Sequence, residues 1–120
     1  MNLDEFISTK IESVDTLHVL LLCYRNPETM WTMREISVKL NIQVPATTQA
    51  LIRLVSDGLL TGEGEPMRYR FWPKSPELQR LTTELSQMDR ERPVTLIKMI
   101  YERARDIQAF ADAFKLKKES

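Results

Sequence analysis

Apolar residues recur at steps of three and four along most of the chain, which is the spacing of amphipathic helices. Two such runs precede Asn26, and two more lie between Thr32 and Gly58. After Gly58 the period changes to two over LLTGEGEPMRYRFWP, which predicts two strands joined by a glycine-containing turn. Further helical runs follow Ser75-Pro76 and Pro93. The pattern therefore predicts a mainly α fold with one small β-hairpin.

Start and stop signals agree with this division of the N-terminal part. The run from Leu3 to Ile11 predicts a short helix, and Ser13 or Asp15 can cap a second one. That second helix should end near Arg25, because the following Asn-Pro pair disfavours further helix.

The segment TMREISVKLNIQVPATTQALIRLVSDG predicts two helices joined by a tight turn. Thr32 and Glu35 have the T-x-x-E spacing of a capping box, which fixes the start of the first helix. Asn41 tolerates the left-handed conformation that a tight turn needs, and Gly58 ends the second helix. The inward residues of the second helix are expected to be Thr47, Ala50, Leu51 and Leu54. Two helices followed at once by a hairpin are the order of a winged helix-turn-helix, so nucleic-acid binding is the leading hypothesis.

Several side chains of this segment have the chemistry to contact DNA. On the second helix, residues 44–58, Gln49 can bind adenine through two hydrogen bonds, and Arg53 can reach guanine or phosphate. The hydroxyls of Thr47 and Thr48 lie near the helix start, where amides favour an anion. On the wing, residues 59–73, period-two alternation places Arg68, Arg70 and Trp72 on one face and Met67, Tyr69 and Phe71 on the other. Arg34 and Lys74 are expected to make secondary phosphate contacts.

An alternative is a winged-helix module that binds another protein and not DNA, supported mainly by the neutral net charge of the chain and also by Ile52. Ile52 is an exposed aliphatic residue in the middle of the reading face and contributes no hydrogen bond, although it could touch a thymine methyl group. Glu63 and Glu65 at the wing tip would repel phosphate, so the base of the wing is the better contact.

The C-terminal run after Pro93 has the 3-4-3-4-3 spacing of a heptad seam. Such a seam can pack on the N-terminal helix of its own chain or pair with a second subunit, and we expect a homodimer. The chain is thus divided into a winged domain, residues 1–74, and a helical dimerisation extension, residues 75–120. A small-molecule effector pocket is expected between the two, lined by Met88, Met99 and Tyr101. The expected seam residues are Ile97, Ile100, Ala104, Ile107, Ala111 and Phe114.

Composition limits the other functions. The 17 basic and 17 acidic residues cancel, so attraction to a polyanion must come from local charge, and residues 31–74 carry six basic and four acidic side chains. The single Cys23 lies in an apolar run and permits no internal disulfide. No cysteine-histidine cluster or catalytic motif is present, so we expect no enzyme activity, metal or cofactor. With no apolar stretch of membrane-spanning length and an acidic N-terminus, the protein is expected to be soluble and cytoplasmic.

The stretch LNIQVPATTQALIRLVSDGLL resembles the recognition-helix segment of bacterial winged-helix regulators of the broad MarR and ArsR type. The resemblance implies a dimer that binds an operator, with Gln43, Thr48, Gln49 and Arg53 at the positions that usually meet DNA. This chain departs from the pattern at Ile52, where such proteins often carry Lys or Arg, and in its acidic wing tip. The segment RERPVTLIKMIYERARDIQAFADAFKLKK is similar to part of a group of small bacterial proteins described as regulators, which supports the fold and not a mechanism.

Overall fold

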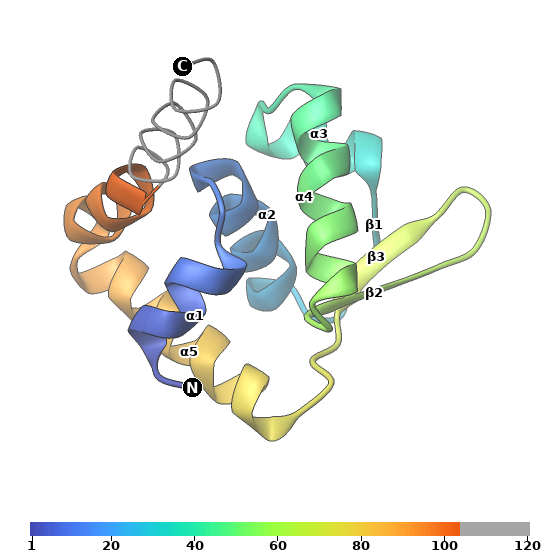
Figure 1. Cartoon of the computed structure of the whole chain (residues 1–120). Coiled ribbons are helices and arrows are strands. Elements are labelled where there is room, and N and C mark those ends of the chain that lie inside the picture. The colour runs from blue at the N-terminus through green and yellow to red at the C-terminus, as the bar shows by residue number, and fades with distance from the viewer. Residues whose placement is uncertain (104–120) are drawn as a thin grey trace, which may run out of the picture.

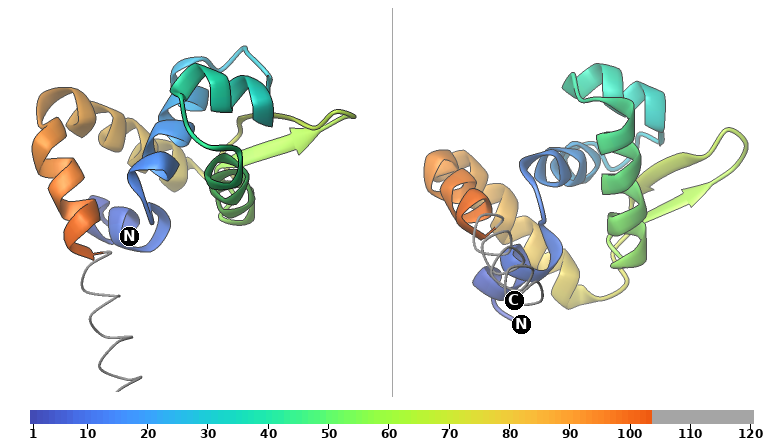
Figure 2. Two further views of the ribbon diagram at one scale, coloured as in Figure 1. Left: turned by 90° about the horizontal axis from the view of Figure 1, so that it is seen from above. Right: turned by 45° about the horizontal axis from the view of Figure 1, so that its top comes forward.

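The computed structural model describes residues 1–103 and has the predicted class of fold, mainly helical with a small antiparallel sheet (Figure 1). A further helix covers 93–103, to the end of the described residues. The wing and this last helix lie at opposite ends of the molecule (Figures 1 and 2). The named elements are α1 (Leu3–Lys10), α2 (Val14–Arg25), β1 (Trp31–Thr32), α3 (Met33–Leu40), α4 (Val44–Ser56), β2 (Leu60–Glu63), β3 (Arg68–Phe71) and α5 (Pro76–Glu91).

Side-chain caps explain why the helices begin where they do. The side chain of Asn2 accepts a hydrogen bond from the Glu5 amide at 2.8 Å, and Ser13 accepts one from the Thr16 amide at 3.0 Å. The cap of α2 is therefore Ser13, one of the two predicted alternatives. Ser75 caps α5 in the same way, as predicted. Each cap satisfies an amide that the first helical turn leaves unpaired.

The sheet has the order β1-β3-β2, with both pairs antiparallel. Leu60 and Phe71 are register partners and are buried, whereas Arg68 and Trp72 are exposed, which confirms the predicted alternation of the wing. The edge strand β1 was not predicted, because two residues are too few to show a period of two.

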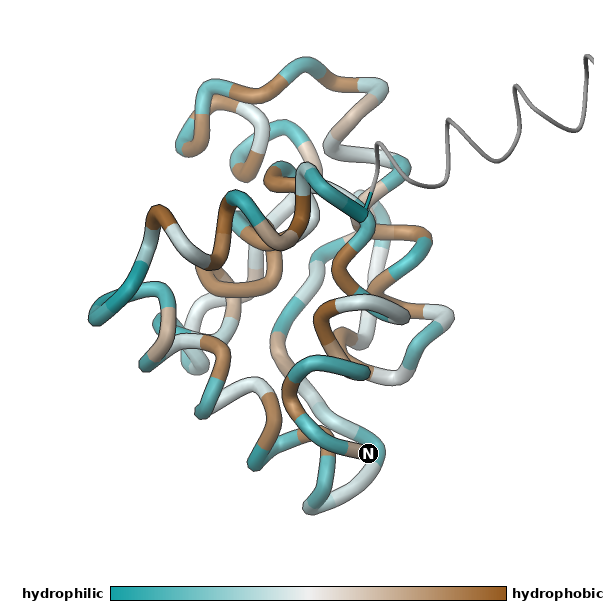
Figure 3. Tube along the Cα trace, turned by 60° about the vertical axis from the view of Figure 1, so that its left-hand side comes forward, coloured by the Kyte–Doolittle hydropathy of each residue, from teal (hydrophilic) through white to brown (hydrophobic). Residues whose placement is uncertain are grey.

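The buried apolar side chains form one continuous core cluster, to which α1, α2, α4 and α5 all contribute. Hydrophobic and hydrophilic residues alternate along the helices, as expected for elements with one inward face (Figure 3). The N-terminal helix α1 packs against α5, and the amino group of Met1 lies 2.9 Å from a carboxylate oxygen of Glu77. In packing, α1 thus belongs with the C-terminal helices as well as with the winged part.

The predicted C-terminal seam is described only at its first two positions. Ile97 is half-buried, and Ile100 is only 2 % exposed because it joins the core of its own chain. A dimer contact through Ile100 was therefore a wrong expectation, and the alternative of packing within the chain holds at this position. The seam residues Ala104, Ile107, Ala111 and Phe114 lie outside the described residues. Among residues 1–103, no helix is both long and apolar enough to cross a membrane.

Candidate nucleic-acid interface

The turn between α3 and α4 is fixed by local hydrogen bonds. The predicted capping box is confirmed: the Glu35 amide donates to Thr32 Oγ1 at 3.2 Å, and the Thr32 amide donates to Glu35 Oε1 at 2.9 Å. Asn41 adopts the predicted left-handed conformation, with φ 55° and ψ 49°. Behind it, the Ser37 hydroxyl donates to the Ile42 carbonyl at 2.6 Å. These bonds set the direction in which the chain enters α4.

One face of α4 is buried, and the opposite face is open to solvent in this chain. The helix lies between α2 and the wing (Figure 1). It starts at Val44, within the predicted range, and Pro45 occupies the second helical position. The predicted inward residues are all buried, namely Thr47, Ala50, Leu51 and Leu54. Exposed side chains of α4 are Val44, Pro45, Thr48, Gln49, Ile52, Val55 and Ser56.

Thr47 cannot serve as the predicted phosphate contact. Its side chain is 0 % exposed, and its hydroxyl donates to the carbonyl of Gln43 at 3.0 Å. The residue therefore supports the first turn of α4 from inside. Gln43, Thr48 and Gln49 are exposed, as a role in binding requires.

Arg53 is held within its own chain and does not project from the open face. Its Nε donates to Asp57 at 2.8 Å, one terminal nitrogen lies 3.3 Å from Glu12, and the other donates to the Thr9 carbonyl at 2.6 Å. The hydrogen bond to Asp57 is the main cause that raises the pKa of the guanidinium. The expected contact from Arg53 to guanine or phosphate is thus not supported by this conformation.

The surroundings of α4 differ in charge from flank to flank. Arg53 is the helix's only charged side chain, so its open face is neutral and partly apolar. On the flank towards the start of α2, Gln49 lines a hollow of about 350 Å³ together with Glu12 and Asp15. Because carboxylates repel phosphate, the flank towards the start of α2 is unfavourable for a polyanion.

The wing carries two arginines on its outer face. One terminal nitrogen of Arg68 lies 3.4 Å from Glu35 Oε1, and the guanidinium carbon of Arg70 lies 4.5 Å from the ring centroid of Trp72. Stacking on an aromatic ring orders a guanidinium and leaves its edges able to donate hydrogen bonds. Lys74 is exposed at the base of the wing, and Arg34 on α3 lines a hollow with wing residues. The structure therefore places four of the five predicted basic contacts on or beside the wing, all except Arg53.

Sequence reasoning missed part of the apolar surface of this region. Besides the expected Ile52, which is 66 % exposed, the side chain of Val38 on α3 is 82 % exposed. Val44 and Val55 are exposed to a lesser degree. Helical phase could have found both α4 valines, since they lie opposite the buried stripe.

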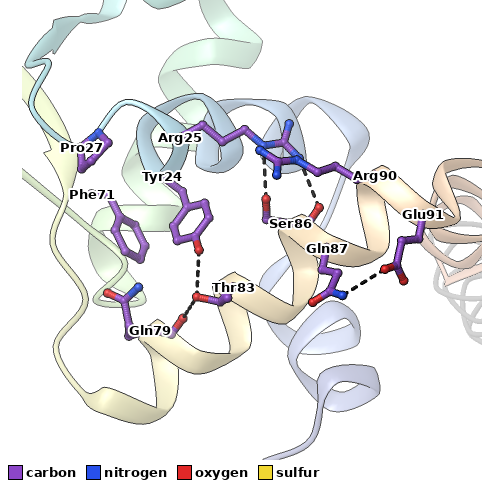
Figure 4. A pocket seen from close by; sticks show the side chains of 10 residues that line it. All are labelled: Tyr24, Arg25, Pro27, Phe71, Gln79, Thr83, Ser86, Gln87, Arg90 and Glu91. Carbon is purple, nitrogen blue, oxygen red and sulfur yellow. Dashed lines mark hydrogen bonds between the residues drawn. The ribbon is translucent and has the colours of Figure 1, made fainter.

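Of the three residues predicted to line an effector pocket, only Tyr101 borders a hollow, one of about 240 Å³ shared with residues 12–15. Met88 is buried and Met99 packs against the core. A separate cavity of about 690 Å³ lies between α2, β3 and α5 (Figure 4). There the Tyr24 hydroxyl donates to Thr83 Oγ1 at 2.8 Å, and Arg25 Nε donates to the Ser86 hydroxyl at 3.2 Å. Within the described part of the chain, no group of metal-ligating side chains is close enough to hold an ion.

The capped helix pair, the open face of α4 and the following hairpin define a winged helix-turn-helix fold. The adhesin competence repressor AdcR of Streptococcus pyogenes has a similar structure, with a TM-score of 0.54 and 15 % identity over 97 % of this chain and 89 % of that one. A mutant of ZitR from Lactococcus lactis is also similar, with a TM-score of 0.53 and 18 % identity over 87 % of this chain and 73 % of that one. No protein-family model matches the chain, and no curated protein is significantly similar to it.

Proposed function

We propose that the protein is a homodimeric, sequence-specific DNA-binding transcriptional regulator of the MarR-like type. The observation that carries this proposal is the open face of α4, held in a fixed direction by the capped turn before it. A helix presented in this way fits the major groove of B-DNA. The fold that the chain shares with a repressor gives independent support.

In this proposal some residues of α4 contact the DNA bases and others contact the phosphates of the DNA backbone. Gln49 reads adenine, since its amide both donates and accepts. Thr48 and Gln43 lie at the start of the helix, where no side chain caps the free amides. Those amides can therefore donate to a phosphate. Arg34, Arg68, Arg70 and Lys74 contact the flanking backbone and set the position of the helix.

The dimer is proposed to form through the C-terminal extension. Val94 and Tyr101 are each more than half exposed on the helix that covers 93–103, which supports a partner on this side of the molecule. Two copies of α4 about 34 Å apart would enter successive major grooves.

The test is selection of bound fragments from random DNA at fixed, low salt, followed by affinity measurements on the selected site. Replacing Gln49 with Ala should weaken binding by about 1–3 kcal/mol and relax the preference at one base position. The matched control is Gln79→Ala, which removes an exposed glutamine from α5 that is not among the proposed DNA contacts. Failure of every fragment to bind at low salt would refute the proposal.

A second candidate, binding to another protein, is favoured by the exposed aliphatic side chains of α3 and α4. Val38 is 82 % and Ile52 is 66 % exposed, and neither side chain can donate or accept a hydrogen bond. The two candidates respond in opposite ways to Ile52→Lys. A cation in the middle of a DNA-facing helix strengthens non-specific DNA binding at low salt, whereas in an apolar protein interface it costs binding.

A further inference from the structure

A cluster of charged side chains joins the C-terminal half of α4 to the turn between α1 and α2. Arg53 lies at its centre and contacts Asp57, Glu12 and the Thr9 carbonyl at the distances given above. Lys10 Nζ lies 3.4 Å from the other carboxylate oxygen of Asp57. The cluster therefore connects residues that are more than 40 positions apart in the sequence.

The hydrogen bonds of Arg53 fix the orientation of α4 relative to α1. Thr9 lies in the last turn of α1, where carbonyls have no partner within the helix, so Arg53 acts as a cap for α1. The side chain of Asp57 is only 13 % exposed and receives both Arg53 and Lys10. Single exposed ion pairs contribute little to folding stability. A planar guanidinium that bonds three groups at once, however, restricts how the two helices that it joins can turn relative to each other.

The two ends of this connection belong to different parts of the proposed regulator. The open face of α4 is the proposed reading surface. The other end, α1, packs against α5 and so moves with the C-terminal helices through which the dimer is proposed to form. The relative orientation of these parts decides how far apart two reading helices lie in a dimer.

We propose that Arg53 is a positioning residue: through Glu12, Asp57 and the Thr9 carbonyl it fixes the angle between α4 and the C-terminal helices. The residue thereby sets the half-site spacing that the dimer accepts. This inference rests on the proposed function. The proposed role of Arg53 is distinct from base reading, because its guanidinium donates its hydrogen bonds to groups of its own chain.

The first experiment varies the distance between half-sites of the selected DNA one base pair at a time. For the full-length wild type, affinity should fall steeply on either side of one spacing. Arg53→Gln and Glu12→Gln should each lower affinity at the best spacing roughly 2- to 30-fold, the range for residues that couple two sites without touching the ligand. Both should flatten the spacing profile while leaving the base preference of each half-site unchanged. A lost base preference in Arg53→Gln alone, or an unchanged profile in both variants, would overturn the inference.

A second measurement needs no DNA and so separates this inference from the proposed function. Spin labels at Thr48→Cys and Gln79→Cys report the distance between α4 and α5 in the free protein. The distance distribution should broaden in Arg53→Gln and keep its wild-type width in Arg80→Gln, which breaks an exposed pair within α5. An unchanged width in Arg53→Gln would overturn the inference even if the wild type binds DNA. A broadened width would uphold the part of it that concerns the angle between α4 and the C-terminal helices even if no DNA binds.

Discussion

The rings of Tyr24 and Phe71 meet edge to face, with centroids 5.2 Å apart and planes at 87°. This contact joins α2 to the returning strand of the wing, and the Tyr24 hydroxyl extends the connection to Thr83 on α5. One aromatic side chain thus links α2, the wing and α5. Edge-to-face pairs add to the free energy that burial alone provides.

Truncation at this contact should be costly for folding. Phe71 is 7 % exposed, so Phe71→Ala is expected to lower the free energy of unfolding by about 3–5 kcal/mol. Tyr24→Phe keeps the ring pair and loses only the hydrogen bond, which should cost about 1 kcal/mol. Urea unfolding followed by circular dichroism measures both. Equal losses in the two variants would show that the ring contact contributes nothing of its own.

The capping box gives a prediction about acid. Because hydrogen bonds from Thr32 hold the pKa of Glu35 below its usual range, this carboxylate stabilises the fold above its ordinary pKa. The stabilisation should be lost as the pH falls through the lowered value. Thr32→Ala should cost about 1 kcal/mol at neutral pH. Glu35→Gln removes the titrating carboxylate and should make unfolding less sensitive to acid. Denaturant midpoints of the wild type and Glu35→Gln across the acid range test this, and identical pH profiles would contradict it.

At Gly58 a side chain would be disfavoured both by the backbone conformation and by a steric clash with Lys74. Its φ is +76°, and an added Cβ would lie 2.6 Å from Cδ of Lys74. Gly58→Ala should lower the free energy of unfolding by at least about 1–2 kcal/mol, the cost of the left-handed conformation alone. Adding Lys74→Ala removes the contact but not the backbone cost, so it should recover only part of the loss. Full recovery in the double variant would mean that the backbone conformation costs nothing.

Cys23 should be inert in the folded protein. It is fully buried, and burial raises the pKa of its thiol to about 12, from an ordinary value of 9.0. A thiol reagent at pH 8 should therefore react only after denaturant is added. Since the unfolded chain loses this proton first, stability should also fall as the pH rises above 9.0. Cys23→Ala is the control that removes both effects, and rapid labelling of the native protein would refute the burial.

Most of the fold could be predicted from the sequence because its signals are local. The box of Thr32 and Glu35 and the left-handed Asn41 depend on neighbours within a few residues, and the structure has them as predicted. The buried stripe of α4 follows from helical phase alone. Strand β1 was missed because two residues show no period, and because β3, with which it pairs, lies more than 35 residues away in the chain.

The candidate site was harder to predict, since phase gives the direction of a side chain and not its partners. Arg53 lies on the flank of α4, where it can point towards solvent or towards the chain. Glu12 and the Thr9 carbonyl decide between these, and no sequence spacing connects them to Arg53. Thr47 was given both an inward position and a contact with phosphate, and its burial excludes the second. Which residues lie against the C-terminal seam was likewise not readable from its heptad spacing.

Thr32 belongs to two structures at once, because it pairs with Arg68 in the sheet and caps α3 through Glu35. Arg68 in turn lies within reach of the same Glu35 carboxylate. Any tilt of the hairpin is therefore transmitted to the first turn of α3 without a flexible joint between them. A bound molecule that bends the hairpin would therefore rotate α3 and α4 with it. The wing and the helix pair should then bind and dissociate as one unit.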